Sequence, residues 1–202
     1  MKDAYLTISK PSEGIYKEKG SKFMAFACPV YSEDDFKAFI QQLKMDYHNA
    51  RHHCYAFRLG LTEHEYRYSD DGEPNNSAGK PIYGQLLSNN ITNVAVVVVR
   101  YFGGTKLGVG GLITAYKEAT ADAIRNATII SKTVDHYYQL LFDYPVMSDV
   151  MHFVKLHQLQ VYHQVFEQSC LMEFNIRITE AENIITEFEK IEGIQLKLIK
   201  TI

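Results

Sequence analysis

The feature that most constrains the fold is an unbroken apolar run, Val94-Ala95-Val96-Val97-Val98-Val99, near the middle of the 202-residue chain. Five of its six residues are valines, whose branched side chains favour extended backbone. A strand that is apolar at every position, rather than at alternate positions, is typical of a sheet covered on both faces. The run therefore predicts a doubly buried strand within residues 92–100.

The sequence before this run predicts a domain of mixed helices and strands, because apolar residues recur there at both spacings. The expected elements are a strand over Lys22–Val30, a helix capped by Ser32, two strands over Arg51–Leu59 and Glu63–Ser69 around the turn Gly60-Leu61-Thr62, and a short helix from Pro81 to Ser88.

A glycine-rich loop follows the run and leads into another expected helix. It reads Gly103-Gly104-Thr105-Lys106-Leu107-Gly108-Val109-Gly110-Gly111, with five glycines in nine residues. Free N–H groups at a helix start, together with Lys106, would form a phosphate cradle. The loop has neither the ending of a P-loop nor the spacing of a dinucleotide fingerprint. Two interpretations stay open: the loop binds phosphate or a nucleic-acid backbone, or it only packs strand against helix.

The acidic turn Asp70-Asp71-Gly72-Glu73-Pro74 is a second candidate site. Its carboxylates are the oxygen ligands that Mg²⁺ prefers, and neighbouring carboxylates raise one another's pKa, as acid/base catalysis requires. Acidic turns with glycine and proline are also common solvated loops. Asp70, Asp71 and Glu73 are metal candidates only under an enzymatic alternative; the favoured interpretation has no catalytic residue, metal or cofactor.

The segment Arg51-His52-His53-Cys54-Tyr55 places a cysteine next to histidines. On a strand, His52 and Cys54 would share one face and the other three residues the opposite face. A nucleophilic cysteine or a zinc site is conceivable, but the paired spacing of structural zinc sites is missing. The favoured interpretation is a buried cysteine beside a hydrogen-bonded histidine.

Basic and aromatic residues gather where the buried strand ends. Arg100, Tyr101 and Phe102 close the strand, and Lys106 follows. Aromatic rings stack on nucleobases and cations contact phosphates, so this mixture is typical of proteins that bind single strands or RNA loops. The alternative is a pair of core aromatics beside surface charge. The predicted binding face is Arg100, Tyr101, Lys106 and the five loop glycines, with His52 and Lys80 added.

The C-terminal third predicts a β-α-β-β-α-β order, the ferredoxin-like pattern. The expected elements are a strand over Tyr138–Tyr144, a helix started by Pro145, a hairpin of Leu159–Phe166 and Leu171–Ile178 around Glu167-Gln168-Ser169, a helix with Thr179 and Glu182 as its capping box, and a strand over Ile194–Ile199 after Gly193.

Composition changes near residue 133, which predicts two domains, 1–133 and 134–202. The first carries 16 Lys and Arg against 14 Asp and Glu, and the second 5 against 10. The overall net charge of −3 gives no strong general attraction to nucleic acid. The acidic second domain is a candidate surface for a protein partner.

Three widely spaced cysteines, Cys28, Cys54 and Cys170, fit a reduced, cytoplasmic protein. No apolar run approaches the roughly 20 residues of a membrane helix, and the N-terminal residues do not resemble a signal peptide. The sequence therefore predicts no membrane partner.

Four ordered motifs resemble the IMPACT family, in its bacterial branch. They are Gly20-Ser21-Lys22-Phe23, Arg51-His52-His53-Cys54-Tyr55-Ala56-Phe57, Asp70-Asp71-Gly72-Glu73-Pro74 with Ala78-Gly79-Lys80-Pro81, and Arg100 to Leu112 continuing to Ala115-Tyr116. The chain departs from the family pattern at Asn75-Asn76, where Ser-Gly is more frequent, and at Thr114, where a basic residue is usual.

The resemblance implies an α+β chain. Its first domain would be similar to the second domain of small-subunit ribosomal protein five, and its second to the C-terminal domain of the ribosomal translocase. It also implies a non-enzymatic, translation-associated factor that binds RNA or a ribosomal surface. Two alternatives stay open: a phosphate- or nucleotide-binding enzyme that uses loops 103–111 and 70–73, and a protein-interaction adaptor.

Overall fold

The computed structural model describes residues 3–61, 65–167 and 169–202. The chain forms two compact units, one of Tyr5–Lys132 and one of Thr133–Ile202 with Asp3 and Ala4. Both combine helices with antiparallel strands, and each has its own core. In the part of the chain that is described, no helix is long and apolar enough to cross a membrane.

The first unit is built on a five-stranded sheet in which every neighbouring pair is antiparallel. Its strands, in spatial order, are β2 (Ser12–Glu18), β3 (Ser21–Pro29), β6 (Val94–Tyr101), β4 (His52–Arg58) and β5 (Tyr66–Ser69). A separate two-stranded sheet pairs β1 (Ala4–Ile8) with β7 (Ile129–Thr133).

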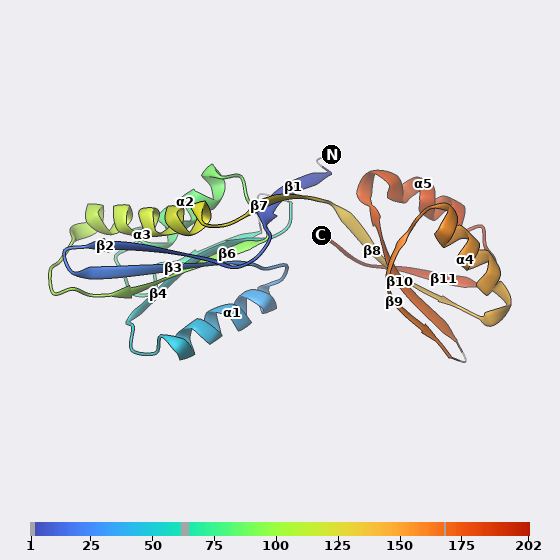
Figure 1. Ribbon diagram of the computed structural model, residues 1–202, viewed down its shortest axis with the longest axis horizontal. Coiled ribbons are helices and arrows are strands. Elements are labelled where there is room, and N and C mark those ends of the chain that lie inside the picture. Colours follow the sequence, from blue (N-terminus) through green and yellow to red (C-terminus); the bar gives the residue numbers. More distant parts are fainter. Residues whose placement is uncertain (1–2, 62–64, 168) are drawn as a thin grey trace. The chain divides into compact units, whose positions relative to one another are not determined.

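Strand β6 lies at the centre of the larger sheet and is buried on both faces. Val94, Val96 and Val98 belong to a core shared with helices α2 (Gly79–Ser88) and α3 (Gly108–Arg125). The alternate residues Ala95, Val97 and Val99 belong to a second core, shared with helix α1 (Glu33–Asp46). All six are fully inaccessible, and Figure 1 shows α1 on the opposite side of the sheet from α2 and α3. The prediction from the unbroken run is confirmed.

Two helix starts show how local sequence positions the elements. The Ser32 hydroxyl accepts a hydrogen bond from the Asp35 N–H at 3.1 Å and caps α1, as predicted. Helix α2 begins at Gly79, two residues before Pro81. The Asp70 carboxylate explains the earlier start, because its Oδ1 accepts the N–H groups of Ala78 and Gly79 at 2.9 and 2.8 Å.

Strands β1, β2 and β7 were not predicted from the sequence. Strand β2 is mostly exposed, so its apolar residues do not alternate clearly. It is held instead by close packing on α3, because a Cβ on Gly14 would lie 2.2 Å from the Ala123 nitrogen.

The second unit has the predicted element order. Strand β8 (Asp135–Phe142) leads through a short 3₁₀ turn containing Pro145 to helix α4 (Met147–Leu156), strands β9 (Gln160–Phe166) and β10 (Cys170–Arg177), helix α5 (Ile178–Phe188) and strand β11 (Ile194–Thr201). The strands lie in the order β11-β8-β10-β9, and each neighbouring pair is antiparallel. Residues of both helices join one core with the sheet.

The predicted capping box of α5 is wrong. The helix starts at Ile178, its N-cap is Arg177, and no side chain caps it. Strand β10 runs directly into the helix, and the Ile178 N–H donates to the Val134 carbonyl at 2.8 Å. Thr179 therefore already lies in the first helical turn. Gln168 of the expected hairpin turn, and residues 62–64 of the expected turn and strand, lie outside the described residues.

Candidate functional site

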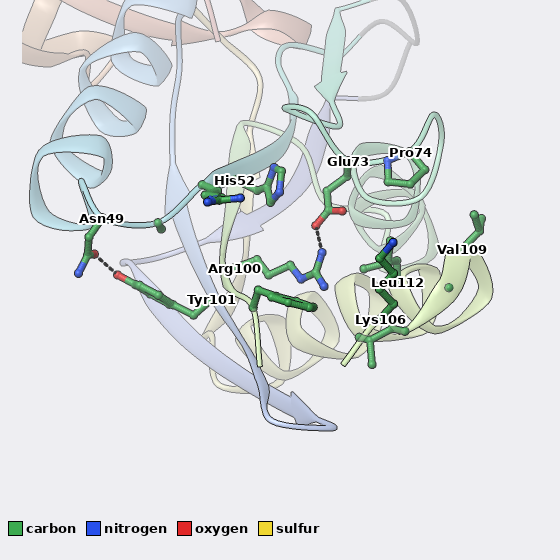
Figure 2. A pocket seen from close by; sticks show the side chains of 14 residues that line it. Asn49, His52, Glu73, Pro74, Arg100, Tyr101, Lys106, Val109 and Leu112 are labelled. Atoms are coloured by element: carbon green, nitrogen blue, oxygen red, sulfur yellow. Dashed lines mark hydrogen bonds and ion pairs between the residues drawn. The ribbon is translucent and has the colours of Figure 1, made fainter. Parts of the chain in front are cut away.

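A pocket of about 890 Å³ opens in the first unit where β6 ends and α3 begins. Strands β4 and β6 are antiparallel, with His52 opposite Arg100, so the start of β4 meets the end of β6. The acidic turn and the glycine-rich loop complete the wall (Figure 2). The lining residues are Asn49, Ala50, Arg51, His52, Glu73, Pro74, Arg100, Tyr101, Phe102, Lys106, Leu107, Gly108, Val109 and Leu112.

Arg100 lines the pocket as a buried and paired cation. Its side chain is only 8% exposed, and its Nη1 donates to Glu73 Oε1 at 2.5 Å. The guanidinium carbon lies 5.4 Å from the ring centroid of Phe23 and 5.7 Å from that of Phe102. Its Nε is buried without a hydrogen-bond partner among the described residues. Because Arg100 already pairs with Glu73, the position of the Arg100 side chain is fixed before any ligand binds.

Glu73 joins this pair to the helix and to β4. The Tyr116 hydroxyl of α3 donates to the same Glu73 oxygen at 2.8 Å. The Cys54 thiol lies 3.3 Å from that hydroxyl and 3.0 Å from the Asp70 carbonyl oxygen. Burial strongly raises the pKa of both Cys54 and Tyr116. Burial therefore favours the protonated thiol of Cys54, which lies in the core of the first unit.

His52 also lies as the favoured interpretation expected. Its Nδ1 is 2.8 Å from the Asp71 carbonyl oxygen, which can only accept. Nδ1 therefore carries the proton, and in the neutral ring Nε2 is left as an acceptor. Together with the fully buried Cys54, this confirms a buried cysteine beside a hydrogen-bonded histidine.

The three carboxylates of the acidic turn are directed to different protein donors. Asp70 accepts backbone N–H groups at the start of α2, Asp71 Oδ2 accepts the His53 N–H at 2.7 Å, and Glu73 accepts from Arg100 and Tyr116. Across the described ranges, no three His, Cys, Asp or Glu side chains converge in a way that could hold a metal ion. The turn fixes the wall of the pocket and the start of α2.

Tyr101 lines the pocket beside Asn49, on the side of the opening away from Glu73. Its hydroxyl donates to Asn49 Oδ1 at 2.7 Å, and its ring packs against the core on the α1 side. Figure 2 shows it turned towards Asn49, whereas Arg100 points towards Glu73. The aromatic ring available to a ligand is that of Phe102, which is 58% exposed.

Lys106 and the start of α3 form the most open cationic part of the rim. Lys106 is exposed, and the first turn of α3 has neither a side-chain cap nor an acidic residue. Backbone N–H groups at an uncapped helix start attract anions. Arg51, also exposed, adds a second cation to the lining.

The loop glycines divide by role. Gly108 lines the pocket, and its φ of +71° suits glycine. Gly103 serves packing, since a Cβ there would lie 1.9 Å from the Gly20 carbonyl carbon. Gly104, Gly110 and Gly111 are not among the lining residues, and neither is Lys80, which is exposed on α2. The structure thus brings together Arg100, Tyr101, Lys106, Gly108 and His52, and leaves the other predicted residues outside.

Sequence reasoning missed Asn49, Pro74, Val109 and Leu112 as lining residues and did not select Arg51 or Phe102 for the site. Phe102 had a usable signal, because it follows Arg100 and Tyr101 at the end of the predicted buried strand. Asn49 and Arg51, next to the start of β4, reach the site because His52 pairs with Arg100.

Residues 19–124 match the Impact N-terminal domain. Over 150 residues the chain is 33% identical to the IMPACT family member YigZ of Escherichia coli, covering 73% of this chain and 74% of that protein. This chain belongs to the IMPACT family.

Two further relatives cover nearly the whole chain. The IMPACT family member YvyE of Bacillus subtilis is 27% identical over 202 residues, which is 94% of this chain and 93% of that protein. A crystal structure of a hypothetical protein is 26% identical, covers 99% of both chains and has a TM-score of 0.75. Both units therefore occur together in relatives of the same length.

Proposed function

We propose that this IMPACT family member is a non-enzymatic, translation-associated factor of the cytoplasm that binds RNA through the pocket of the first unit. The connection with translation comes from the family resemblance. That resemblance assigns a ribosomal-protein-like fold to the first unit and a ferredoxin-like fold, similar to the C-terminal domain of the translocase, to the second. Identification of RNA as the ligand is supported by the pocket itself.

The observation that carries the proposal is the meeting of three kinds of group at one opening. Lys106 and Arg51 supply exposed cations, the uncapped start of α3 supplies backbone donors, and Phe102 supplies an exposed ring. Phosphate contacts give affinity, and stacking on a ring holds an unpaired base. The apolar residues Leu107, Val109 and Leu112 give the base a surface that excludes water.

Arg100 and Glu73 have a positioning role in this proposal. The ion pair is almost completely buried and bridges the end of β6 to the acidic turn. The Arg100 guanidinium also lies over the Phe102 ring, 5.7 Å from its centroid. Of the predicted face, Lys106, His52 and Gly108 are proposed to touch the ligand, whereas Tyr101 and Gly103 hold the wall in place.

The test is sedimentation with ribosomes and anisotropy with labelled RNA across a salt series, for wild type, Lys106→Glu and Lys117→Glu. Lys117 is exposed on α3 but does not line the pocket, so it is a matched control. Loss of one phosphate contact lowers the slope of log affinity against log salt by about 0.7 for a single strand. We expect this change for Lys106→Glu alone. Equal effects of both variants would contradict the site.

A phosphate-bearing small molecule is the second candidate, favoured by the pocket's size. Its volume of about 890 Å³ lies within the range of roughly 300–1,000 Å³ typical of small-molecule sites. A nucleotide that binds more tightly than RNA, and loses binding with Lys106→Glu, would replace RNA as the ligand.

A further inference from the structure

Among the described residues of the second unit, no helix of that unit covers one face of its sheet. Along β10, residues at even positions from Cys170 to Ile176 are buried, and those between them are only partly buried. The buried set packs in the core that contains α4 and α5. Because successive strand residues point to opposite faces, Leu171, Glu173 and Asn175 lie on the other side of the sheet. We call this side the open face.

Strand register identifies the other residues of the open face. Asn175 pairs with Tyr137 and Glu173 with Gln139 in β8, and Gln139 pairs with Lys197 in β11. A bulge after Leu198 then brings Lys200 opposite Tyr137. Residues directly opposite one another share a face, so two lysines and a tyrosine lie together there.

Ring contacts confirm this arrangement. The Lys200 ammonium lies 4.9 Å from the centroid of Tyr137. The ring of Tyr162, from β9, lies 5.7 Å from the same ring on a tilted plane. Tyr162 is 50% exposed. It therefore presents a large accessible aromatic surface, backed by Tyr137 and bordered by Lys200.

The charge of the unit is divided between its two sides. Most of its acidic residues lie on the helices or directly after α5: Asp149, Glu180, Glu182, Glu187, Glu189 and Glu192. The open face carries Lys197 and Lys200 against Glu173 and Asp135. The Glu173 carboxylate accepts a hydrogen bond from Gln139 at 3.0 Å, and Asp135 accepts one from Asn175 at 2.7 Å. The net acidity of the unit thus describes its helical side and does not describe the open face.

We propose that the open face binds a single-stranded RNA segment, at a site separate from the pocket of the first unit. Tyr162 stacks on an unpaired base, and Lys197 and Lys200 contact phosphates. One common RNA-recognition module uses aromatic residues on the face of a four-stranded sheet to stack two or three bases. A protein partner that recognises only the acidic helices would leave the tyrosine and lysines of this face unused.

The experiment measures the anisotropy of a short labelled single-stranded RNA, and of the same RNA as a duplex, with the full chain. The variants are Tyr162→Ala, Tyr162→Phe and Lys200→Glu. Lys155→Glu, an exposed lysine of α4 on the opposite side, is the control for charge. All are made in wild type and in Lys106→Glu, so that the two sites are separated. Photo-cross-linking of halogenated uridine RNA then maps the contacted peptides.

We expect Tyr162→Ala to weaken single-strand binding about 5- to 100-fold, the range for one base stack, and Tyr162→Phe to retain it. Lys200→Glu should weaken binding and Lys155→Glu should not. Cross-links should fall in β8 and β9. Unchanged affinity for Tyr162→Ala, cross-links confined to the first unit, or equal losses for the two lysine variants would each overturn the proposal. If Tyr162→Ala has no effect and Lys106→Glu abolishes binding, the open face fails while the pocket stands.

Discussion

The two units use their sheets in opposite ways. In the first, helices cover both faces, and β6 has no exposed side chain from Val94 to Val99. Any ligand must therefore approach the ends of its strands, and the pocket lies where β6 ends. In the second, both helices pack into one core, and β10 alternates between buried and partly buried residues. In the described part of the second unit, its own helices therefore leave the other face of the sheet uncovered. How a sheet is covered thus decides where binding groups can gather.

The prediction with the largest expected effect compares a charged substitution in the sheet of each unit. Val98→Asp puts an unpaired carboxylate into the doubly covered strand, and we expect it to unfold the first unit, because an isolated buried charge costs more than the roughly 5–15 kcal/mol that stabilises a domain. Leu171→Asp, on the open face, should lower stability by about 1 kcal/mol. Urea denaturation monitored by circular dichroism measures both. Similar losses would show that the open face is covered.

A second test compares a polar pair in each unit. Arg100→Met leaves Glu73 buried without its cation and should cost about 3–5 kcal/mol. Adding Glu73→Gln should restore part of that loss, because the remaining group is neutral. Gln139→Leu, which removes the hydrogen bond to Glu173 on the open face, should cost less than about 1.5 kcal/mol. Thermal denaturation gives the three values. If the double variant is no more stable than Arg100→Met, the buried charge is not the cause.

The smallest expected effect concerns pH. Burial lowers the pKa of His53 below its ordinary value of about 6.5. The unfolded chain then takes up a proton more readily than the folded one. The stability from neutral His53 is present above pH 6.5 or so and is lost as pH falls through the folded value. His53→Gln should flatten the dependence of unfolding free energy on pH between about 7 and 5. His163→Gln, on the open face, is the matched control, and an equal flattening there would rule out burial as the cause.

Much of the fold was predictable because its signals are local. The apolar run predicted a doubly buried strand, Ser32 predicted a helix start, and alternation with helical spacing predicted the order of the second unit. Strand β2 was not predicted, because close packing against α3 stabilises it and its apolar residues do not alternate clearly along the strand. The capping box of α5 failed because a backbone hydrogen bond to Val134 fixed the helix start instead.

The candidate site was only partly predictable. The motifs placed Arg100 and Lys106 in one segment and His52 in another, and residue types alone suggested cations for phosphate. They could not show that Glu73 already pairs with Arg100, or that Tyr101 turns to Asn49 and leaves Phe102 exposed. Likewise, an acidic net charge suggested a protein-docking unit, although the charges lie mainly on its helices.

The sequence by itself determined the doubly buried strand, the element order of the second unit and the membership of the family, because these depend on spacing and residue type along the chain. Tertiary structure decided which side chains meet and which charges remain available. Those depend on strand register: one position of shift would move His52 away from Arg100, or Lys197 to the other face. Strand register is set by packing between segments that are far apart in the chain. It therefore cannot be predicted from the residue spacing within one segment.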